Sequence, residues 1–323
     1  MKSEQIRWGI IGCGQVAEYK SGPAFNRVKN SKLLAVMRRN GERAKDFAYR
    51  HQVPLWYDKA EDLFANDKID AVYVATPPSS HLDYALKSLE VGKHVYLEKP
   101  MVLSPKEGKI LVDAVKKSDS KLVVAHYRRA LPMYTKIRYW LSQEKIGKVE
   151  SVSLSFLKRN DFGAGQSWRL NPSISGGGLF HDLAPHQIDL MYHFFGGIRN
   201  LKGSSARTSE EHNVCDQVQG DIGFESGVQF RGCWNFNAAK NQEKDRCEIN
   251  GSQGSIVFPF YGNTVKVKLG IQSEVFEFED PKHIQQPFIE QTVNYFLGMV
   301  KENPCSVDEG RLVTKIMYEF TKN

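Results

Sequence analysis

Several features are absent from the 323-residue sequence, and each absence excludes a class of protein. No apolar run approaches the roughly 18 residues that a membrane-spanning helix requires, so we expect no association with a membrane. The five cysteines are odd in number and form no C-x-x-C pair, which indicates reduced thiols and not a disulfide framework or a zinc site. The first five residues lack the apolar core of a secretion signal. We therefore expect a cytoplasmic protein.

Positive charge is in only modest excess, with 44 Lys and Arg against 37 Asp and Glu. No basic run of five or more residues exists, so we expect no nucleic-acid partner, although anionic small molecules are compatible with this charge. Hydrophobic residues make up 41% of the chain, which is enough for a sizeable core and excludes a disordered protein. At roughly 100–200 residues per domain, the length predicts two domains.

Residues 1–125 alternate short β-branched runs with amphipathic segments of helical length. Continuous apolar strands between helices are typical of a parallel sheet that is covered on both faces. With right-handed crossovers this pattern predicts a doubly wound, Rossmann-like α/β domain that binds NAD(P). We expect strands at 6–11, 33–37, 71–75, 94–97 and 122–125, and helices from residue 15 and at 42–50, 81–91 and 106–117.

Residues 126–323 have a different pattern, because residues 149–157 alternate polar and apolar side chains as a strand with two unlike faces does. We expect further strands at 214–224, 228–236, 247–249, 256–258, 265–269 and 275–278, and helices at 134–141, 182–195, 288–300 and 309–320. These segments predict an α+β domain with a largely antiparallel, open sheet. We expect helices on one face of this sheet and a second subunit on the other, in a dimer or tetramer.

A glycine-rich turn lies between the first expected strand and the first helix. Its G-x-G-x-x-A pattern consists of Gly12, Cys13, Gly14, Gln15, Val16 and Ala17. Gly12 permits a tight turn, Gly14 lets a pyrophosphate approach the backbone, and the helix N-terminus favours phosphate. The second strand ends in Arg38 and Arg39, where an NAD enzyme usually has an acidic residue. Since arginine bonds well to phosphate, we favour NADP over NAD. The alternatives are a turn without a ligand and arginines at a solvated helix start.

Two further motifs end expected strands, at the edge where ligands of open α/β sheets bind. Thr76, Pro77 and Pro78 are followed by His81, and the next strand ends in Glu98, Lys99 and Pro100. Lys99 is well placed for chemistry, although a solvated surface lysine is the alternative. Farther along, Asp182, His186, Asp189 and His193 share one helical face. We favour catalysis by His186 over a divalent-metal site or a polar face capped by Asp182, and expect no metal.

Taken together, these motifs resemble the glucose–fructose oxidoreductase/inositol dehydrogenase (Gfo/Idh/MocA) family over essentially the whole chain. Tyr127 with two arginines after it, and Trp168-Arg169 ahead of three glycines, also match the family. The resemblance implies a Rossmann domain and an α/β domain whose open sheet often forms the oligomer interface. It places the catalytic lysine on Lys99, the catalytic histidine on His186 and the associated acid on Asp182. Where relatives often have Asp-x-Gly-x-His, this chain has Ala184 and Pro185.

The resemblance implies hydride transfer between NADP, or alternatively NAD, and a secondary alcohol or ketone of a sugar or polyol. It also implies that Tyr127, Trp168 and Arg169 contact the cofactor. The full expected cofactor-binding set is Gly12, Cys13, Gly14, Gln15, Val16, Ala17, Arg38, Arg39, Thr76, Pro77, Pro78, His81, Glu98, Lys99, Tyr127, Trp168 and Arg169. Whether Lys99 or His186 donates the proton stays open. A non-catalytic NAD(P) sensor of the same fold and a metal-assisted hydrolase are the alternatives. Residues 160–175 and 238–245 are expected to determine substrate specificity.

Overall fold

The computed structural model describes residues 4–159 and 168–322. By packing, the chain forms two compact units, each built from two segments: residues 1–128 with 281–314, and residues 129–280 with 315–323. No helix in the described ranges is both long enough and apolar enough to cross a bilayer.

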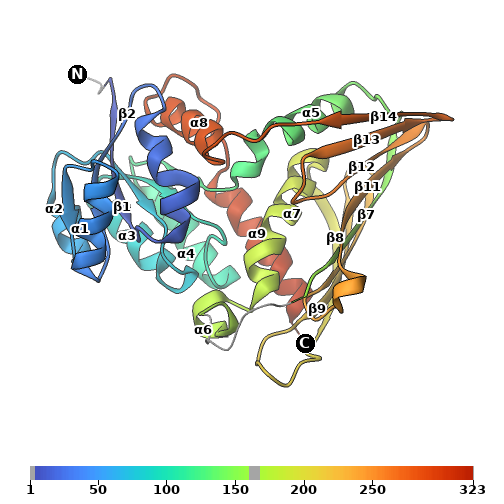
Figure 1. Cartoon of the computed structure of the whole chain (residues 1–323), viewed down its shortest axis with the longest axis horizontal. Helices are drawn as coiled ribbons and strands as arrows, with labels where there is room; N and C mark the ends of the chain where they lie inside the picture. The colour runs from blue at the N-terminus through green and yellow to red at the C-terminus, as the bar shows by residue number, and fades with distance from the viewer. Residues whose placement is uncertain (1–3, 160–167, 323) are drawn as a thin grey trace. The chain divides into compact units, whose positions relative to one another are not determined.

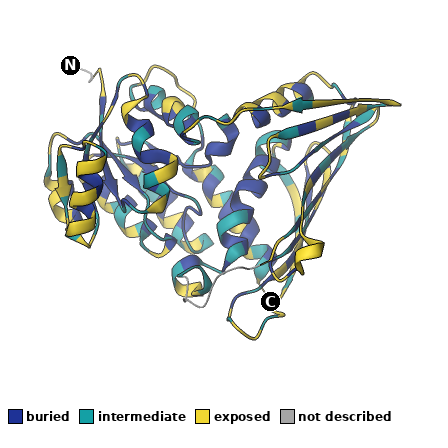
Figure 2. Ribbon diagram, in the orientation of Figure 1, coloured by how far each residue is buried: buried dark blue, intermediate teal, exposed yellow. Residues whose placement is uncertain are grey.

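The first unit contains the expected parallel sheet, with six strands in the order β3-β2-β1-β4-β5-β6 (Figure 1). The strands are β1 (Ile6–Ile11), β2 (Ser31–Met37), β3 (Leu55–Tyr57), β4 (Ala71–Val74), β5 (His94–Leu97) and β6 (Leu122–Val124). Every residue of β4 and β6 is buried, so both faces of the sheet are covered, as Figure 2 shows in dark blue. This finding confirms the doubly wound fold class.

Among the described residues, six α-helices belong wholly or partly to the first unit. They are α1 (Gly41–Arg50), α2 (Ala60–Ala65), α3 (His81–Glu90), α4 (Pro105–Lys117), α8 (Gln286–Phe296) and the start of α9 (Val307–Thr321). Asn40 caps α1 by accepting the Arg43 N–H at 3.0 Å, and Ser104 caps α4 ahead of a proline in its first turn. Trp8 of β1 packs on Phe296 of α8, with 5.7 Å between ring centroids, so a late helix covers the early strands. Strand β3 and helix α2 were not expected from the sequence.

The second unit is built on an eight-stranded sheet in the order β14-β13-β12-β11-β7-β10-β9-β8. The strands are β7 (Val149–Leu157), β8 (Ile198–Ala206), β9 (Gln217–Phe224), β10 (Gln229–Asn235), β11 (Lys244–Gly251), β12 (Gly254–Phe258), β13 (Thr264–Leu269) and β14 (Gln272–Glu277). All neighbours are antiparallel except β10 and β7, which confirms the α+β class with a largely antiparallel sheet. Strand β8 was missed because it is a polar edge strand with no buried position.

Helices α5 (Pro132–Ser142) and α7 (Leu179–Phe195) cover one face of this sheet (Figure 1). Phe180 of α7 packs edge-on against Trp234 at 5.2 Å between ring centroids, and Trp140 of α5 packs on Phe276 at 4.7 Å. On the other face, Arg231 bonds Asp221 at 2.7 Å and exposed polar side chains predominate. The second subunit expected on that face stays a prediction.

Candidate active site

The glycine-rich turn follows β1 and has the geometry of a phosphate-binding loop. Gly12 has φ +94°, and a Cβ at this position would lie 2.9 Å from the carbonyl of Ala75, so only glycine fits. A Cβ at Gly14 would meet nothing closer than the Gly12 carbonyl oxygen at 4.0 Å, which leaves the turn open to a ligand. Burial raises the pKa of the Cys13 thiol to about 11, so this side chain stays protonated at neutral pH.

The residues after the turn begin a helix whose first N–H groups have no carbonyl one turn earlier. Gln15 and Val16 lie in this first turn, where free N–H groups and the helix dipole favour a phosphate. The helix then continues as η1 (Ala17–Ser21), a short π-helix that the sequence pattern did not predict. With the open face of Gly14, this arrangement fits the pyrophosphate of a nicotinamide dinucleotide.

Arg38 lies beside the glycine-rich turn. Its Nη1 donates to the carbonyl of Cys13 at 3.4 Å, and its backbone N–H donates to the carbonyl of Tyr57 at 3.1 Å. Arg39 is exposed. The residue after β2 therefore places a guanidinium, and not a carboxylate, next to the turn. This position agrees with the two arginines, Arg38 and Arg39, found there in the sequence.

The ends of β4 and β5 lie on the same edge of the sheet as this turn, because Ile11, Val74 and Leu97 are aligned in register. Lys99 follows β5 after one residue, and β5 is separated from β1, which leads into the turn, only by β4. The Lys99–Pro100 peptide is cis, the form that the proline made possible.

His81 connects the loops that follow β4 and β5. Its Nδ1 lies 2.9 Å from the carbonyl oxygen of Pro100, and its Nε2 lies 2.8 Å from that of Thr76. The side chain has no exposed surface, and this burial lowers its pKa. Pro78 begins η3 (Pro78–Ser80), which leads into α3. The expected contacts of these residues with a cofactor stay predictions. The same holds for Tyr127, which is buried; the Cζ atom of Arg128 lies 5.9 Å from the centroid of its ring.

In the second unit, α7 carries Asp182 in its first turn and buried His186 one turn later. Asp182 accepts a hydrogen bond from Nε of Arg169 at 2.8 Å, and this guanidinium stacks on the Trp168 ring at 4.6 Å. The structure thus joins Asp182, predicted as the acid associated with His186, to Trp168 and Arg169, which were both predicted to contact the cofactor. Helix α7 continues through Pro185. Within residues 4–159 and 168–322, no three His, Cys, Asp or Glu side chains are grouped as a metal site would need.

Two features near α7 have structural explanations. Asp189 forms a buried ion pair with Arg129, with the Nη2 atom 2.6 Å from Oδ1. A Cβ at Gly177 would lie 2.4 Å from Nδ1 of His181, and Gly176 through Gly178 all have positive φ, so the glycine run allows close packing. Burial lowers the pKa of His181 to about 4, which keeps its imidazole neutral.

Residues 160–167 of the first expected specificity loop lie outside the described residues. The second, residues 238–245, ends at Asp245, which accepts the backbone N–H groups of Phe260 and Tyr261 at 2.8 and 2.7 Å. The Tyr261 hydroxyl in turn donates to the carbonyl of Leu183 in α7 at 3.3 Å. Through Asp245 and Tyr261, this loop is therefore connected to the helix that carries Asp182 and His186.

Sequence patterns did not indicate two residues that contact Glu98, the neighbour of Lys99. The Tyr73 hydroxyl and the Gln285 amide both donate to its Oε1, at 2.6 and 2.7 Å. Gln285 is 187 residues away in the chain, so no local motif could have revealed this contact.

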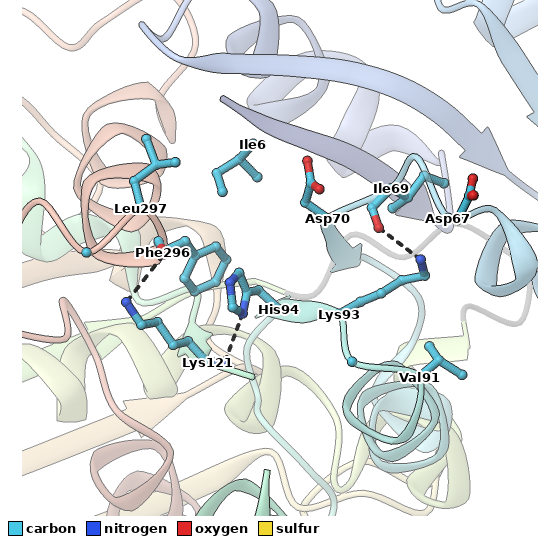
Figure 3. A pocket seen from close by; sticks show the side chains of 12 residues that line it. Ile6, Asp67, Ile69, Asp70, Val91, Lys93, His94, Lys121, Phe296 and Leu297 are labelled. Atoms are coloured by element: carbon cyan, nitrogen blue, oxygen red, sulfur yellow. Dashed lines mark hydrogen bonds between the residues drawn. The ribbon is translucent and has the colours of Figure 1, made fainter. Parts of the chain in front are cut away.

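A cavity of about 560 Å³ lies in the first unit (Figure 3). Its lining residues stand at the edge of the sheet opposite the glycine-rich turn. Residues that precede β4, β5 and β6 line it together with the end of α8. Its cations already have partners: Lys93 donates to the carbonyls of Asn66 and Ile69, both at 2.8 Å, and Lys121 donates to the carbonyl of Phe296 at 3.3 Å. This cavity has neither the glycine-rich turn nor Lys99, so it is not the candidate site.

Comparison with known proteins gives matches over both units. Residues 6–126 match the family model described as "Oxidoreductase family, NAD-binding Rossmann fold", and residues 134–257 match the "GFO/IDH/MocA C-terminal domain". The chain is 53% identical to "Oxidoreductase P35" of Formosa agariphila, over 98% of each chain. It is 26% identical to "scyllo-inositol 2-dehydrogenase (NADP(+)) IolU" of Bacillus subtilis, over 98% of this chain and 96% of the relative.

Among solved structures, a levoglucosan dehydrogenase in complex with NADH and levoglucosan is similar, with a TM-score of 0.86. The match covers 98% of this chain and 96% of the other at 22% identity, a level at which it shows the fold alone.

Proposed function

Because the chain belongs to the Gfo/Idh/MocA oxidoreductase family, with an NAD-binding Rossmann domain, we propose that it oxidises a secondary alcohol of a sugar or polyol, or reduces the matching ketone. The observation that carries this proposal is the position of Lys99 at the carboxyl end of β5, on the same sheet edge as the glycine-rich turn. A scyllo-inositol dehydrogenase among the relatives supports a polyol substrate. Arg38 beside the turn supports NADP as the dinucleotide.

When bound, the dinucleotide supplies or accepts the hydride, and the protein residues manage position and protons. His186 acts as general base in oxidation and as general acid in reduction, a role that suits imidazole because its ordinary pKa lies near neutrality. Asp182, held by Arg169, orients that ring. Lys99 donates a hydrogen bond to the reacting oxygen and stabilises the negative charge that develops there. In an alternative assignment Lys99 is the proton donor.

The test is turnover of a polyol panel, beginning with scyllo-inositol and levoglucosan and their ketones, followed by the absorbance of the reduced nicotinamide. Lys99→Met should lower kcat at least ~100-fold, the usual effect of losing an acid–base or oxyanion-stabilising group, with little change in dinucleotide affinity. Lys109→Met is the matched control, since Lys109 is an exposed lysine paired with Asp113 on α4. Wild-type turnover in the Lys99 variant would refute the assigned role.

A further inference from the structure

The carboxylate of Glu98 lies at the centre of a buried hydrogen-bond network. Glu98 is 5% exposed, and its Oε1 accepts both the Tyr73 hydroxyl at 2.6 Å and the Gln285 amide at 2.7 Å. A buried carboxylate without such donors is strongly destabilised, so these two bonds determine how the group is oriented. Burial and the nearby carboxylate raise the pKa of Tyr73 well above its usual value, so its hydroxyl remains a donor.

The network also includes Tyr96 of β5 and two residues of η1. The Tyr96 hydroxyl donates to Oε1 of Gln285 at 2.8 Å, and the Ser21 hydroxyl donates to the Tyr73 oxygen at 3.2 Å. Ser21 is the last residue of η1, the helix that follows the glycine-rich turn. The backbone N–H of Gln285 also donates to the carbonyl of Lys20 in η1 at 3.3 Å. Contacts therefore run from the phosphate-binding helix to Glu98.

The other oxygen of Glu98 contacts the backbone of Lys99. The Lys99 N–H donates to Oε2 of Glu98 at 3.2 Å, and the carbonyl oxygen of the next residue, Pro100, lies 2.9 Å from Nδ1 of His81. The main chain is thus held on both sides of the Lys99 side chain. Because a displacement of about 1 Å at a reacting group can lower the rate ~100-fold, such support affects catalysis.

We propose that Gln285 and Tyr73 are positioning residues for Lys99, since they orient the Glu98 carboxylate that holds the Lys99 backbone. This inference rests on the catalytic role proposed for Lys99. The variants Gln285→Met and Tyr73→Phe test it, because each removes one donor to Glu98 with little change in side-chain size. Thr292→Val is the matched control: it removes a buried hydroxyl from α8 that donates to the carbonyl of Phe288 in the same helix.

The first measurement needs no substrate. The rate at which acetic anhydride labels the Lys99 amine is followed by mass spectrometry across pH, with exposed Lys109 as internal reference. We expect the Gln285 and Tyr73 variants to change this rate at least threefold and to displace its pH midpoint, and the Thr292 variant to match the wild type. Unchanged labelling of Lys99 in both variants would overturn the inference, whatever the outcome for turnover.

The second measurement is a double-mutant cycle with NADP⁺ and the panel polyol of highest turnover. Gln285→Met should lower kcat about 10-fold or more, with KM and the dinucleotide Kd within about twofold. Added to Lys99→Met, it should lower the residual rate no further, because both changes act through the same group. Additive losses would assign Gln285 a structural role alone. A Lys99→Met enzyme with normal turnover would instead refute the catalytic role proposed for Lys99, and a wild-type enzyme that turns over no member of the panel would refute the proposed function; the labelling result tests neither.

Discussion

Arg38 is the residue on which the choice of dinucleotide depends. Its guanidinium lies within 3.4 Å of the carbonyl of Cys13, where a 2′-phosphate would find a cation and an NAD enzyme would have a carboxylate. We predict that NADP⁺ raises the melting temperature more than NAD⁺, and that Arg38→Asp reverses this order. Loss of a charge-assisted contact costs about 1.5–3 kcal/mol, or about 10- to 100-fold in the Kd of NADP⁺.

The matched control for this variant is Arg138→Asp, which makes the same charge change on an exposed position of α5 in the other unit. The thermal shift is measured for both variants with each dinucleotide, and only Arg38→Asp should change the order of the two shifts. An Arg38 variant that still favours NADP⁺ to the wild-type extent would show that this side chain does not bind the 2′-phosphate.

His94 makes the stability of the first unit depend on pH. Burial lowers its pKa to about 4 from the ordinary value of 6.5, while its Nδ1 accepts the N–H of Lys121 at 3.0 Å. Between these two pH values the unfolded chain binds a proton that the folded protein does not. The free energy of unfolding therefore falls as pH falls from about 6.5 to about 4, by at most about 3 kcal/mol.

The variant His94→Asn should lack this pH-dependent part of the free energy of unfolding, because the amide oxygen can accept the same N–H but does not titrate. Urea unfolding at pH 7 and pH 4.5 measures the difference, and we expect a smaller loss of stability on acidification in the variant. An equal loss in both proteins would show that His94 is not the group responsible.

At the scale of elements, the end of α9 packs on the sheet of the second unit through a pair of glycines. Gly203 of β8 and Gly220 of β9 lie directly opposite each other, and Phe320 occupies the space above them. A Cβ at Gly220 would lie 2.1 Å from the Phe320 ring, so the absence of side chains creates this contact.

We predict that Gly220→Ala destabilises the protein by about 1–3 kcal/mol, the usual cost of overpacking a filled core. The variant Phe320→Leu should relieve part of that loss when combined with it, because the smaller side chain makes room for the new methyl group. Ser204→Val, which adds bulk at an exposed position of β8, is the control. Urea unfolding gives the free energies of unfolding of the wild type, the two single variants, the double variant and the control. Full additivity of the Gly220 and Phe320 changes would contradict the proposed packing contact.

Element boundaries were predictable where burial imposes a period on the sequence. Strand β7 was expected at its observed bounds because apolar Val152, Leu154 and Phe156 alternate with polar residues. Strand β8 was not, since Gly203 and Ser205 occupy half-buried positions and give the sequence no apolar alternation. The π-helix after the glycine-rich turn was also missed, because residues 17–21 carry no sequence signal that distinguishes it from an α-helix.

At the scale of the whole molecule, the exposed face of the eight-stranded sheet is where we propose that copies of the chain associate. Ser153, Arg231 and Asp221 lie in register across β7, β10 and β9 on this face. We predict a dimer or tetramer by light scattering, and a shift toward monomer for Ser153→Lys, which brings like charges together. Ser142→Lys, at the end of α5, is the control. A monomeric wild-type protein would refute this proposal.

The sequence by itself determined the glycine-rich turn, the arginines after β2, the strands of both sheets except β3 and β8, and the helical spacing of Asp182 and His186. These follow from periodicity and from backbone preferences, which act between near neighbours in the chain. Only the tertiary structure decided that residues 281–314 pack with the first unit, that Gln285 contacts Glu98 and that Phe320 covers two glycines. The reason is that side-chain packing and buried hydrogen bonding select these partners in space, and neither leaves a local pattern in the sequence.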